Sequence, residues 1–381
     1  MKKKSKADAA IAILIRLVIL IMATHSVPAW AQHKKVLLPE EDEKRISLYE
    51  KELEKYLANY LVNEYEERSS KLWKRDYSSI AAFERSVAKN RQRWEEVVIK
   101  PPVLSKTGAL KRKPYNILGI EAEWLELPLG NLSAQAVIAF PPTASSGKPV
   151  PLVIALHGIE SGPETAFENG PSYHAYARAL LEAGFAVLAP LNMRSISRRN
   201  NIERFTRLAD ISLPGIELAR LQHLLDVVLQ DKRIDSEKVG AWGVSLGGMA
   251  TMFWMPLEPR IKAGVVSAWF NHRVNKMVVP DESYGSFYPN EEYAFLTGWL
   301  TEFSDHDVMS LICPRPVQIQ HGKNDRIAKW SQVVEEFEKS KLHYDRLNIA
   351  DRIELKLHEG RHEALTREGV SFLKKWLQND Q

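Results

Sequence analysis

The 381-residue sequence predicts an α/β protein: a mostly parallel sheet with helices on both faces, preceded by a small helical segment. Three observations predict this fold class. After residue 102, short apolar runs alternate with helical stretches, and before it the apolar spacing is helical only. The composition is that of a globular chain, with 45% hydrophobic and 26% charged residues and only 19 Gly and 20 Pro. These values exclude collagen-like, low-complexity and disordered chains.

The first 31 residues have the pattern of a secretory signal peptide. A basic start is followed by an apolar run over residues 9–23 and by the small-x-small site Ala29-Trp30-Ala31 immediately before Gln32. The run is shorter than the roughly 20 apolar residues that span a bilayer and it carries Arg16, which favours cleavage over an uncleaved membrane anchor. We therefore expect an exported protein, periplasmic or secreted, with no stable membrane anchoring after cleavage.

Charge and cysteine content narrow the possible partners. The chain has 52 basic and 48 acidic residues, and removing the five basic and one acidic residue of positions 1–31 leaves 47 of each. A neutral mature chain gives little reason to expect nucleic acid or an anionic membrane surface as a partner. Cys313 is the only cysteine, so the chain can form no internal disulfide and must be stabilised by its core.

Residues 32–103 are predicted to form a helical segment. Apolar and aromatic side chains recur at steps of three and four between residues 40 and 98, with a break near Ser69-Ser70, and Pro101-Pro102 ends the pattern. We interpret this as two helices docked on the main domain. Their packing faces comprise Tyr49, Leu53, Tyr56, Leu57, Tyr60 and Leu61 in the first, and Ile80, Phe83, Val87 and Trp94 in the second.

Residues 104–381 are predicted to form the main domain. Seven short apolar runs have the length and composition of strands: residues 134–140, 151–156, 185–189, 239–242, 263–268, 315–320 and 353–357. Five helical candidates alternate with them: residues 172–183, 214–229, 246–255, 331–341 and 365–377. This alternation predicts parallel strands that are buried on both faces.

A strand-to-helix turn carries the most informative chemical motif. Gly243-Val244-Ser245-Leu246-Gly247 follows an apolar strand and opens a helix. A serine on so sharp a turn needs near-absent side chains two residues before and after it, because the backbone is crowded there, and two glycines supply them. The N–H groups that begin the next helix point at developing negative charge. The pattern indicates a nucleophile rather than a bystander serine in a glycine-rich turn.

Four motifs together resemble the α/β-hydrolase superfamily: Ser245 in its turn, His157-Gly158 after a strand, the run His321-Gly322-Lys323-Asn324-Asp325, and Gly360-Arg361-His362. Within it, Pro314-Arg315-Pro316-Val317 and residues 235–239 resemble the dienelactone-hydrolase-like and acetyl-xylan-esterase-like branch. The resemblance covers about residues 115–378. It implies the α/β-hydrolase fold and a serine hydrolase activity.

The chain order Ser245, Asp325, His362 is the order of nucleophile, acid and base in this fold. A serine hydroxyl is a poor nucleophile at neutral pH, so an imidazole must accept its proton and a carboxylate must orient that imidazole. We predict His362 as the base and Asp325 as the acid, although Asp325 also suits a plain turn. His358 is the alternative base, but it continues a strand, whereas His362 lies in the loop before the last helix.

Two backbone N–H groups are predicted to form the oxyanion hole. One belongs to Leu246, just after the nucleophile, and the other to Ile159, in the loop after His157-Gly158. We interpret His157 itself as a structural residue that organises this loop.

One stretch departs from the family pattern. Members often carry an Asp after the strand that corresponds to residues 185–189, where this chain has Leu191-Asn192-Met193-Arg194. No substrate contact near Arg194 can therefore be carried over. A carboxylate-binding role for Arg194 is possible, but its run with Arg198 and Arg199 is more typical of a solvated loop.

An insertion at about residues 270–312 separates two predicted strands, and such an insertion beside a site forms a lid or a binding wall. Its aromatic side chains either line an acyl or sugar site or pack the insertion on the domain. They are Trp269, Phe270, Tyr284, Phe287, Tyr288, Tyr293, Phe295, Trp299 and Phe303.

These features predict an exported serine esterase, a carboxylic ester hydrolase that forms an acyl-enzyme. The resemblance favours short-chain acyl esters, acetyl above all, of a small molecule or carbohydrate. No His-Glu-x-x-His and no phosphate-binding glycine loop occurs, so we expect neither metal nor cofactor. One alternative is a serine peptidase of the same fold, although the helical segment is too short for the β-propeller such peptidases carry. Another is a catalytically retired glycan-binding protein.

Overall fold

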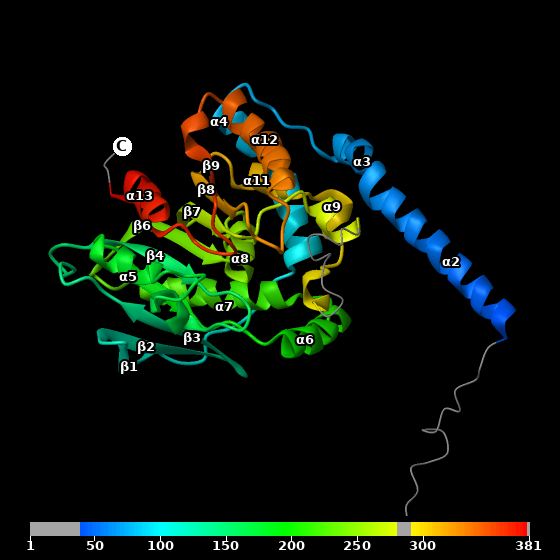
Figure 1. Ribbon diagram of the computed structural model, residues 1–381. Helices are drawn as coiled ribbons and strands as arrows, with labels where there is room; N and C mark the ends of the chain where they lie inside the picture. Colours follow the sequence, from blue (N-terminus) through cyan, green and yellow to red (C-terminus); the bar gives the residue numbers. More distant parts are fainter. Residues whose placement is uncertain (1–38, 280–290, 379–381) are drawn as a thin grey trace, which may run out of the picture. The chain divides into compact units, whose positions relative to one another are not determined.

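The computed structural model describes residues 39–279 and 291–378, so the predicted signal peptide lies outside the described residues (Figure 1). The described chain forms two compact units, one ending at Leu57 and the other running from Ala58. The second unit is built on a nine-stranded sheet in the order β1-β2-β3-β5-β4-β6-β7-β8-β9. From β5 to β9 in that order, neighbouring strands pair in parallel. At the other edge, β1 with β2, β2 with β3 and β3 with β5 pair antiparallel. The predicted mostly parallel sheet is therefore confirmed.

All seven predicted strands are present: β3 (Leu132–Ala139), β4 (Val150–Leu156), β5 (Ala186–Pro190), β6 (Ile234–Val244), β7 (Ile261–Ser267), β8 (Val317–Gly322) and β9 (Ile353–His358). Two strands at the antiparallel edge were not predicted, β1 (Lys111–Ile117) and β2 (Ile120–Leu129). β1 is an exposed edge strand rich in polar residues, so it lacks the apolar run that marks a central strand.

Helices cover both faces of the sheet, as predicted. The five expected helices are α5 (Tyr176–Glu182), α7 (Leu213–Val228), α8 (Leu246–Trp254), α12 (Trp330–Arg346) and α13 (Thr366–Leu377). Four further helices were not predicted: α6 (Ile196–Leu208), α9 (Arg273–Val278), α10 (Trp299–Glu302) and α11 (Asp305–Ile312). Alternate strand residues enter two cores, one under α5 and α13 and the other under α7, α8 and α12. This two-sided burial explains why the central strands are continuous apolar runs.

The helical segment consists of α2 (Glu40–Ala58), the π-helical turn η2 (Asn59–Asn63), α3 (Tyr65–Leu72), α4 (Ile80–Arg93) and the π-helical turn η3 (Trp94–Ile99). The predicted break between the two helical stretches is present but lies later than expected, between Leu72 and Ile80, because Ser69 is buried inside α3. Ser79 begins α4 by accepting a hydrogen bond from the Ala82 N–H. Trp94 packs edge-on against Phe253 and donates its indole N–H to the Phe253 carbonyl at 3.0 Å. Docking of the second predicted helix on the main domain is thus confirmed.

The first predicted packing face has a different outcome. No side chain of α2 is buried, and Tyr49, Leu53, Tyr56 and Leu57 are all exposed. Most of α2 belongs to the first unit, which contains no other described element against which these side chains could pack. The predicted packing of this face is therefore not found within the unit.

A buried polar network joins α3 and the loop after it to α11 and α12. The Asp307 carboxylate accepts hydrogen bonds from the Tyr65 hydroxyl and the Arg75 guanidinium. Next to it, His306 Nδ1 lies 3.0 Å from Glu336 Oε1. Burial by itself would lower the pKa of His306, but the charges of Asp307 and Glu336 outweigh it and raise that pKa to about 9. The part of the helical segment that belongs to the second unit is held to the sheet domain by these bonds as well as by apolar packing.

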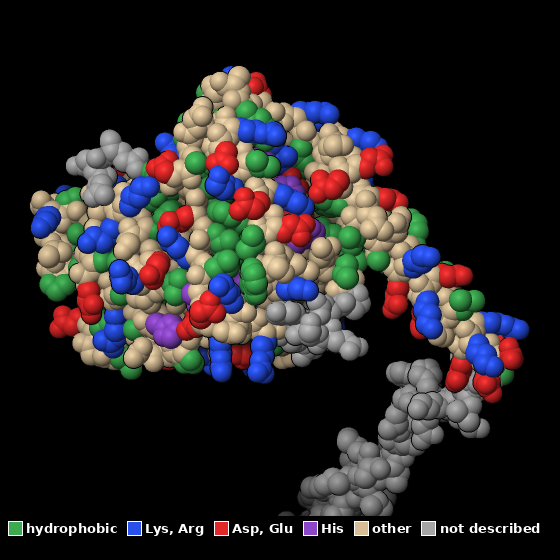
Figure 2. Space-filling model, turned by 45° about the horizontal axis from the view of Figure 1, so that its top comes forward, with side chains coloured by type: hydrophobic (Ala, Val, Ile, Leu, Met, Phe, Trp, Pro, Cys, Tyr) green, Lys and Arg blue, Asp and Glu red, His purple; other side chains and the backbone are tan. Residues whose placement is uncertain are grey.

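The outer surface has no dominant sign of charge on the face seen in Figure 2, where acidic and basic side chains are intermingled. This agrees with the balanced charge of the chain after residue 31. Within residues 39–279 and 291–378, no helix is long and apolar enough to cross a membrane.

Candidate active site

Ser245 lies where β6 ends and α8 begins, at the carboxyl edge of the parallel strands. Its backbone is strained, with φ 59° and ψ −120°, and its N–H donates to the Ser267 carbonyl at 2.9 Å. A Cβ on Gly243 would lie 2.0 Å from the Gly247 carbonyl oxygen, and one on Gly247 would lie 2.0 Å from the Leu156 carbonyl oxygen. Both glycines are therefore required for the turn, for the steric reason that the motif predicts.

Two backbone donors lie beside this turn. Leu246 is the first residue of α8, where an N–H has no acceptor inside the helix. In the loop after β4, the Gly158 N–H donates to the Tyr173 hydroxyl at 2.6 Å and the Glu160 N–H to the Arg194 carbonyl at 2.9 Å. The N–H of Ile159, between them, has no acceptor among the described residues. The N–H groups of the two predicted oxyanion donors are thus both uncommitted, and Ile159 lines the same cavity as Ser245.

Asp325 and His362 meet across the loops after β8 and β9. His362 Nδ1 lies 2.7 Å from Asp325 Oδ2, and Asp325 Oδ1 accepts the Ile327 N–H at 2.8 Å. Burial would raise the pKa of Asp325, but its bond to His362, the His362 charge and the Ile327 N–H hold the pKa below its usual range. The other ring nitrogen, His362 Nε2, is enclosed and has no hydrogen-bond partner in the described structure. The ring therefore keeps one nitrogen uncommitted while the carboxylate orients the other.

The alternative base is placed differently. His358 is the last residue of β9, and its Nδ1 accepts the Gly360 N–H at 3.1 Å. Desolvation lowers its pKa. No hydrogen bond joins His358 to Asp325 in the described part of the chain, so the geometry favours His362.

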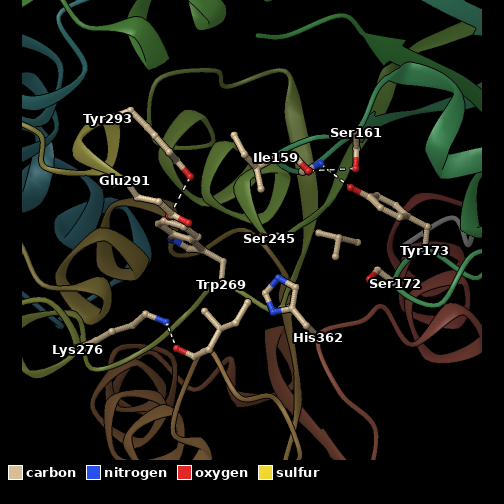
Figure 3. A pocket seen from close by; sticks show the side chains of 14 residues that line it. Ile159, Ser161, Ser172, Tyr173, Ser245, Trp269, Lys276, Glu291, Tyr293 and His362 are labelled. Atoms are coloured by element: carbon tan, nitrogen blue, oxygen red, sulfur yellow. Dashed lines mark hydrogen bonds between the residues drawn. The ribbon is translucent and has the colours of Figure 1, made fainter. Parts of the chain in front are cut away.

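Ser245 and His362 line one cavity of about 180 Å³ (Figure 3). Ile159 also lines it, as do Trp269 and Tyr293 from the flank and the body of the insertion. A cavity of this size is well below the roughly 300 Å³ at which pockets for drug-sized ligands begin, and it suits a small group. Sequence reasoning missed two charged residues of its wall, Lys276 and Glu291, because neither belongs to a motif.

The insertion uses its other described aromatic residues for packing. Phe270, Trp299 and Phe303 are buried, and Trp299 packs edge-on against Phe253. Phe295 is exposed. Tyr284, Phe287 and Tyr288 lie outside the described residues. Of the described aromatic residues of the insertion and its flank, only Trp269 and Tyr293 line the cavity.

Two loop expectations can be compared with the structure. His157 bonds through Nδ1 to the Gly158 carbonyl and through Nε2 to the Asn192 N–H, and burial lowers its pKa, which fits its predicted role in organising the loop.

The expected solvated loop around Arg194 and Arg198 is wrong for Arg199, which lies in α6 fully buried and 2.8 Å from Glu217. A buried carboxylate partner, distant in sequence, overrides the local charge pattern.

The sheet order, the strained serine turn and the Ser, Asp, His chain order define the α/β-hydrolase fold. In the parts of the chain that the structure describes, no group of three or more His, Cys, Asp or Glu is placed to hold a metal ion.

Comparisons with known proteins agree with this fold. No protein-family model matches the chain. It is 24% identical over 290 residues to "Putative hydrolase YtaP" of Bacillus subtilis (strain 168), a match that covers 72% of this chain and 93% of that protein. Among solved structures, it is similar to a "putative acetyl xylan esterase" from Bacteroides fragilis NCTC 9343, with a TM-score of 0.58, 17% identity, and 79% and 86% of the two chains covered. It is also similar to a carbohydrate esterase family 15 glucuronoyl esterase from Caldicellulosiruptor kristjansonii, with a TM-score of 0.56, 18% identity, and 80% and 88% covered.

Proposed function

We propose that this protein is an exported serine esterase that hydrolyses short-chain acyl esters, above all acetyl esters, of carbohydrates. The observation that carries the proposal is the hydrogen bond of 2.7 Å between Asp325 and His362, with His362 Nε2 uncommitted at the cavity that Ser245 also lines. A bystander serine would have no reason to share a small cavity with an imidazole that a buried carboxylate orients.

The proposed first half-reaction forms an acyl-enzyme. Ser245 Oγ attacks the ester carbonyl carbon while its proton moves to His362 Nε2. The carbonyl oxygen becomes an oxyanion and accepts hydrogen bonds from the N–H groups of Leu246 and Ile159. When the tetrahedral intermediate collapses, the C–O bond to the alcohol breaks and His362 gives its proton to the departing oxygen. The alcohol leaves, and the acyl group stays on Ser245.

The second half-reaction returns the enzyme to its starting state. A water molecule gives one proton to His362 Nε2 and attacks the acyl carbon, and the same two N–H groups hold the oxyanion. The bond to Ser245 Oγ then breaks, and the proton passes from His362 back to Oγ. The balance is one ester and one water consumed, one acid and one alcohol released.

The size and polarity of the cavity support small acyl groups. Its volume of about 180 Å³ and its charged wall leave little room for a long apolar chain. We therefore expect turnover of p-nitrophenyl acetate to exceed turnover of the octanoate steeply. Acetylated glycans should release acetate, in line with the carbohydrate esters named for the similar solved structures.

A fluorophosphonate labelling gel tests the proposal most directly. We expect labelling of the purified protein that is lost in Ser245→Ala. A protein that takes no label would be a retired glycan-binding protein instead. Labelling with peptide cleavage but no ester turnover would point to a serine peptidase of the same fold, and preference for the octanoate would point to a lipase-like or aryl esterase.

Export depends on residues 1–31 and has its own test. The small residues Ala29 and Ala31 fit a signal-peptidase site, so the mature chain is expected to begin at Gln32. N-terminal sequencing of exported material checks this, and recovery of Met1 would contradict it.

A further inference from the structure

The wall of the cavity carries a buried lysine. Lys276 belongs to α9, and its Nζ donates to the Ile327 carbonyl at 2.6 Å (Figure 3). An ammonium group has three donors, and the Ile327 carbonyl is the only acceptor it has among the described residues. Burial, with the nearby Arg273 charge, lowers the pKa of Lys276 to about 7. Burying the Lys276 ammonium group costs free energy unless acceptors in the cavity take hydrogen bonds from its remaining N–H groups.

An acceptor and a second donor lie in the same wall. Glu291 accepts the Tyr293 hydroxyl at 3.1 Å, and burial raises the pKa of its carboxyl. The Trp269 indole N–H is buried with no acceptor in the described structure. The Arg273 guanidinium lies 4.3 Å from the centre of the Trp269 ring and pairs with Asp305 at 3.0 Å, which fixes the indole in place.

The two charged groups do not neutralise each other directly. Within the described residues, no ion pair joins Lys276 to Glu291, although both line the one cavity and their charges act on each other. A purely structural pair of buried charges would be expected to close into a salt bridge with every donor used. An open pair in a cavity beside a nucleophile is instead suited to a ligand that lies between them.

We propose, on the basis of the proposed esterase function, that Lys276, Glu291 and Trp269 form a subsite for the hydroxyl groups of a sugar ring joined to the scissile ester. Each sugar hydroxyl both donates and accepts, so it can satisfy the Lys276 and Trp269 donors and the Glu291 acceptor at once. An apolar acyl chain would leave both charges without partners, and a free carboxylate would meet the like charge of Glu291. A neutral polyhydroxylated ring is the ligand class that satisfies all three groups.

The test compares esters with and without ring hydroxyls in Lys276→Met and Glu291→Gln. The probes are p-nitrophenyl acetate, an acetylated xylo-oligosaccharide, in which the ring is the leaving alcohol, and methyl glucuronate, in which the ring is the acyl part. In each variant we expect kcat/KM for a sugar ester to fall at least about tenfold more than kcat/KM for p-nitrophenyl acetate, mainly through KM. A selective loss of activity on the acetylated xylo-oligosaccharide places the subsite on the alcohol side of the ester. A selective loss on methyl glucuronate places it on the acyl side.

Matched controls separate binding from folding. Lys262→Met removes a lysine that also donates to a backbone carbonyl, that of Pro259 at 3.2 Å, outside this cavity, and Glu121→Gln changes an exposed carboxylate on β2. Neither control should change the ratio of the two activities, and the fluorophosphonate labelling rate verifies that each variant is folded.

Equal losses on all esters in Lys276→Met and Glu291→Gln, or no loss on a sugar ester that the protein hydrolyses, would overturn the subsite. Turnover of p-nitrophenyl acetate without turnover of either sugar ester would also overturn it and would leave the serine esterase standing. Absence of fluorophosphonate labelling at Ser245 would overturn the proposed function itself.

Discussion

Two histidine–carboxylate pairs of the second unit, each with a buried carboxylate, differ in what surrounds the second ring nitrogen. His306 lies 3.0 Å from Glu336 through Nδ1 and 3.5 Å from Asp307 through Nε2, so carboxylates face both sides of its ring. His362 lies 2.7 Å from Asp325 through Nδ1, while its Nε2 has no partner among the described residues. Both ring nitrogens of His306 therefore face a carboxylate, whereas only Nδ1 of His362 does.

This difference separates a structural pair from a candidate catalytic one. Two carboxylates around His306 favour a fixed imidazolium, which adds attraction between α11 and α12 but cannot readily take up another proton. A single carboxylate beside His362 fixes the tautomer and leaves a nitrogen that can accept a proton from Ser245. The strength of a histidine–carboxylate contact is therefore less informative than the state of the nitrogen opposite to it.

The largest expected effect comes from removing either end of the proposed proton transfer. Ser245→Ala and His362→Ala should each lower kcat by at least about 10³, because members of a triad act as a unit. The melting temperature of both variants should stay near that of the unchanged protein. Steady-state kinetics on p-nitrophenyl acetate measures the loss, and substantial turnover by purified Ser245→Ala would identify another nucleophile.

Asp325→Asn tests whether the carboxylate acts through the imidazole. The amide can donate to His362 Nδ1 and thereby favour the wrong tautomer, so kcat should fall by at least about 10². Little stability should be lost, because Oδ1 can still accept the Ile327 N–H. If Asp325→Asn retained nearly full activity, Asp325 would be only a turn residue.

His306→Gln probes the other pair and should change stability rather than chemistry. The folded pKa of about 9 lies above the unfolded value of about 6.5, so this histidine stabilises the fold fully below about pH 6.5 and loses that contribution as the pH rises through 9. The stability difference between the unchanged protein and the variant should therefore shrink with pH, by at most about 1.4 kcal/mol per pH unit in this window.

Denaturant unfolding at pH 6, 7.5 and 9 measures this difference. The groups that face His306 are Asp307, Glu336, Arg75 and His343, and none of them changes in the variant. A difference that stays constant with pH would mean that folding does not raise the pKa of His306.

The smallest effect is expected for His358→Ala. Its Nδ1 bonds only to the Gly360 N–H two residues away, and it makes no hydrogen bond to Asp325 in the described structure. Activity should change by less than about threefold, with a modest loss of stability from one hydrogen bond. Comparison with His362→Ala in the same assay checks this, and the reverse order of the two losses would reassign the base.

Local sequence was sufficient to predict an element wherever the interactions that form it are between neighbours in the chain. The central strands were predictable because burial on both faces makes each a continuous apolar run. β1 was missed because its residues are polar and lie at an exposed edge, and β2 was missed because its buried leucines alternate with less buried residues and form no continuous apolar run. Arg199 was misjudged because its partner, Glu217, lies in a different helix. The stripe on α2 had helical spacing, but spacing alone does not tell which partner covers a face.

The serine turn and the few candidates for the acid and the base were determined by the sequence itself. The two glycines around Ser245 are demanded by backbone contacts of 2.0 Å, and the chain order restricts the acid and the base to few positions. Only the tertiary structure decided that Asp325 contacts His362 rather than His358, and that Lys276 and Glu291 line the same cavity as Ser245. The physical reason is that steric demands of a turn act between neighbours in the chain, whereas hydrogen bonds and shared burial act between groups that only the packing of distant segments brings within a few ångströms.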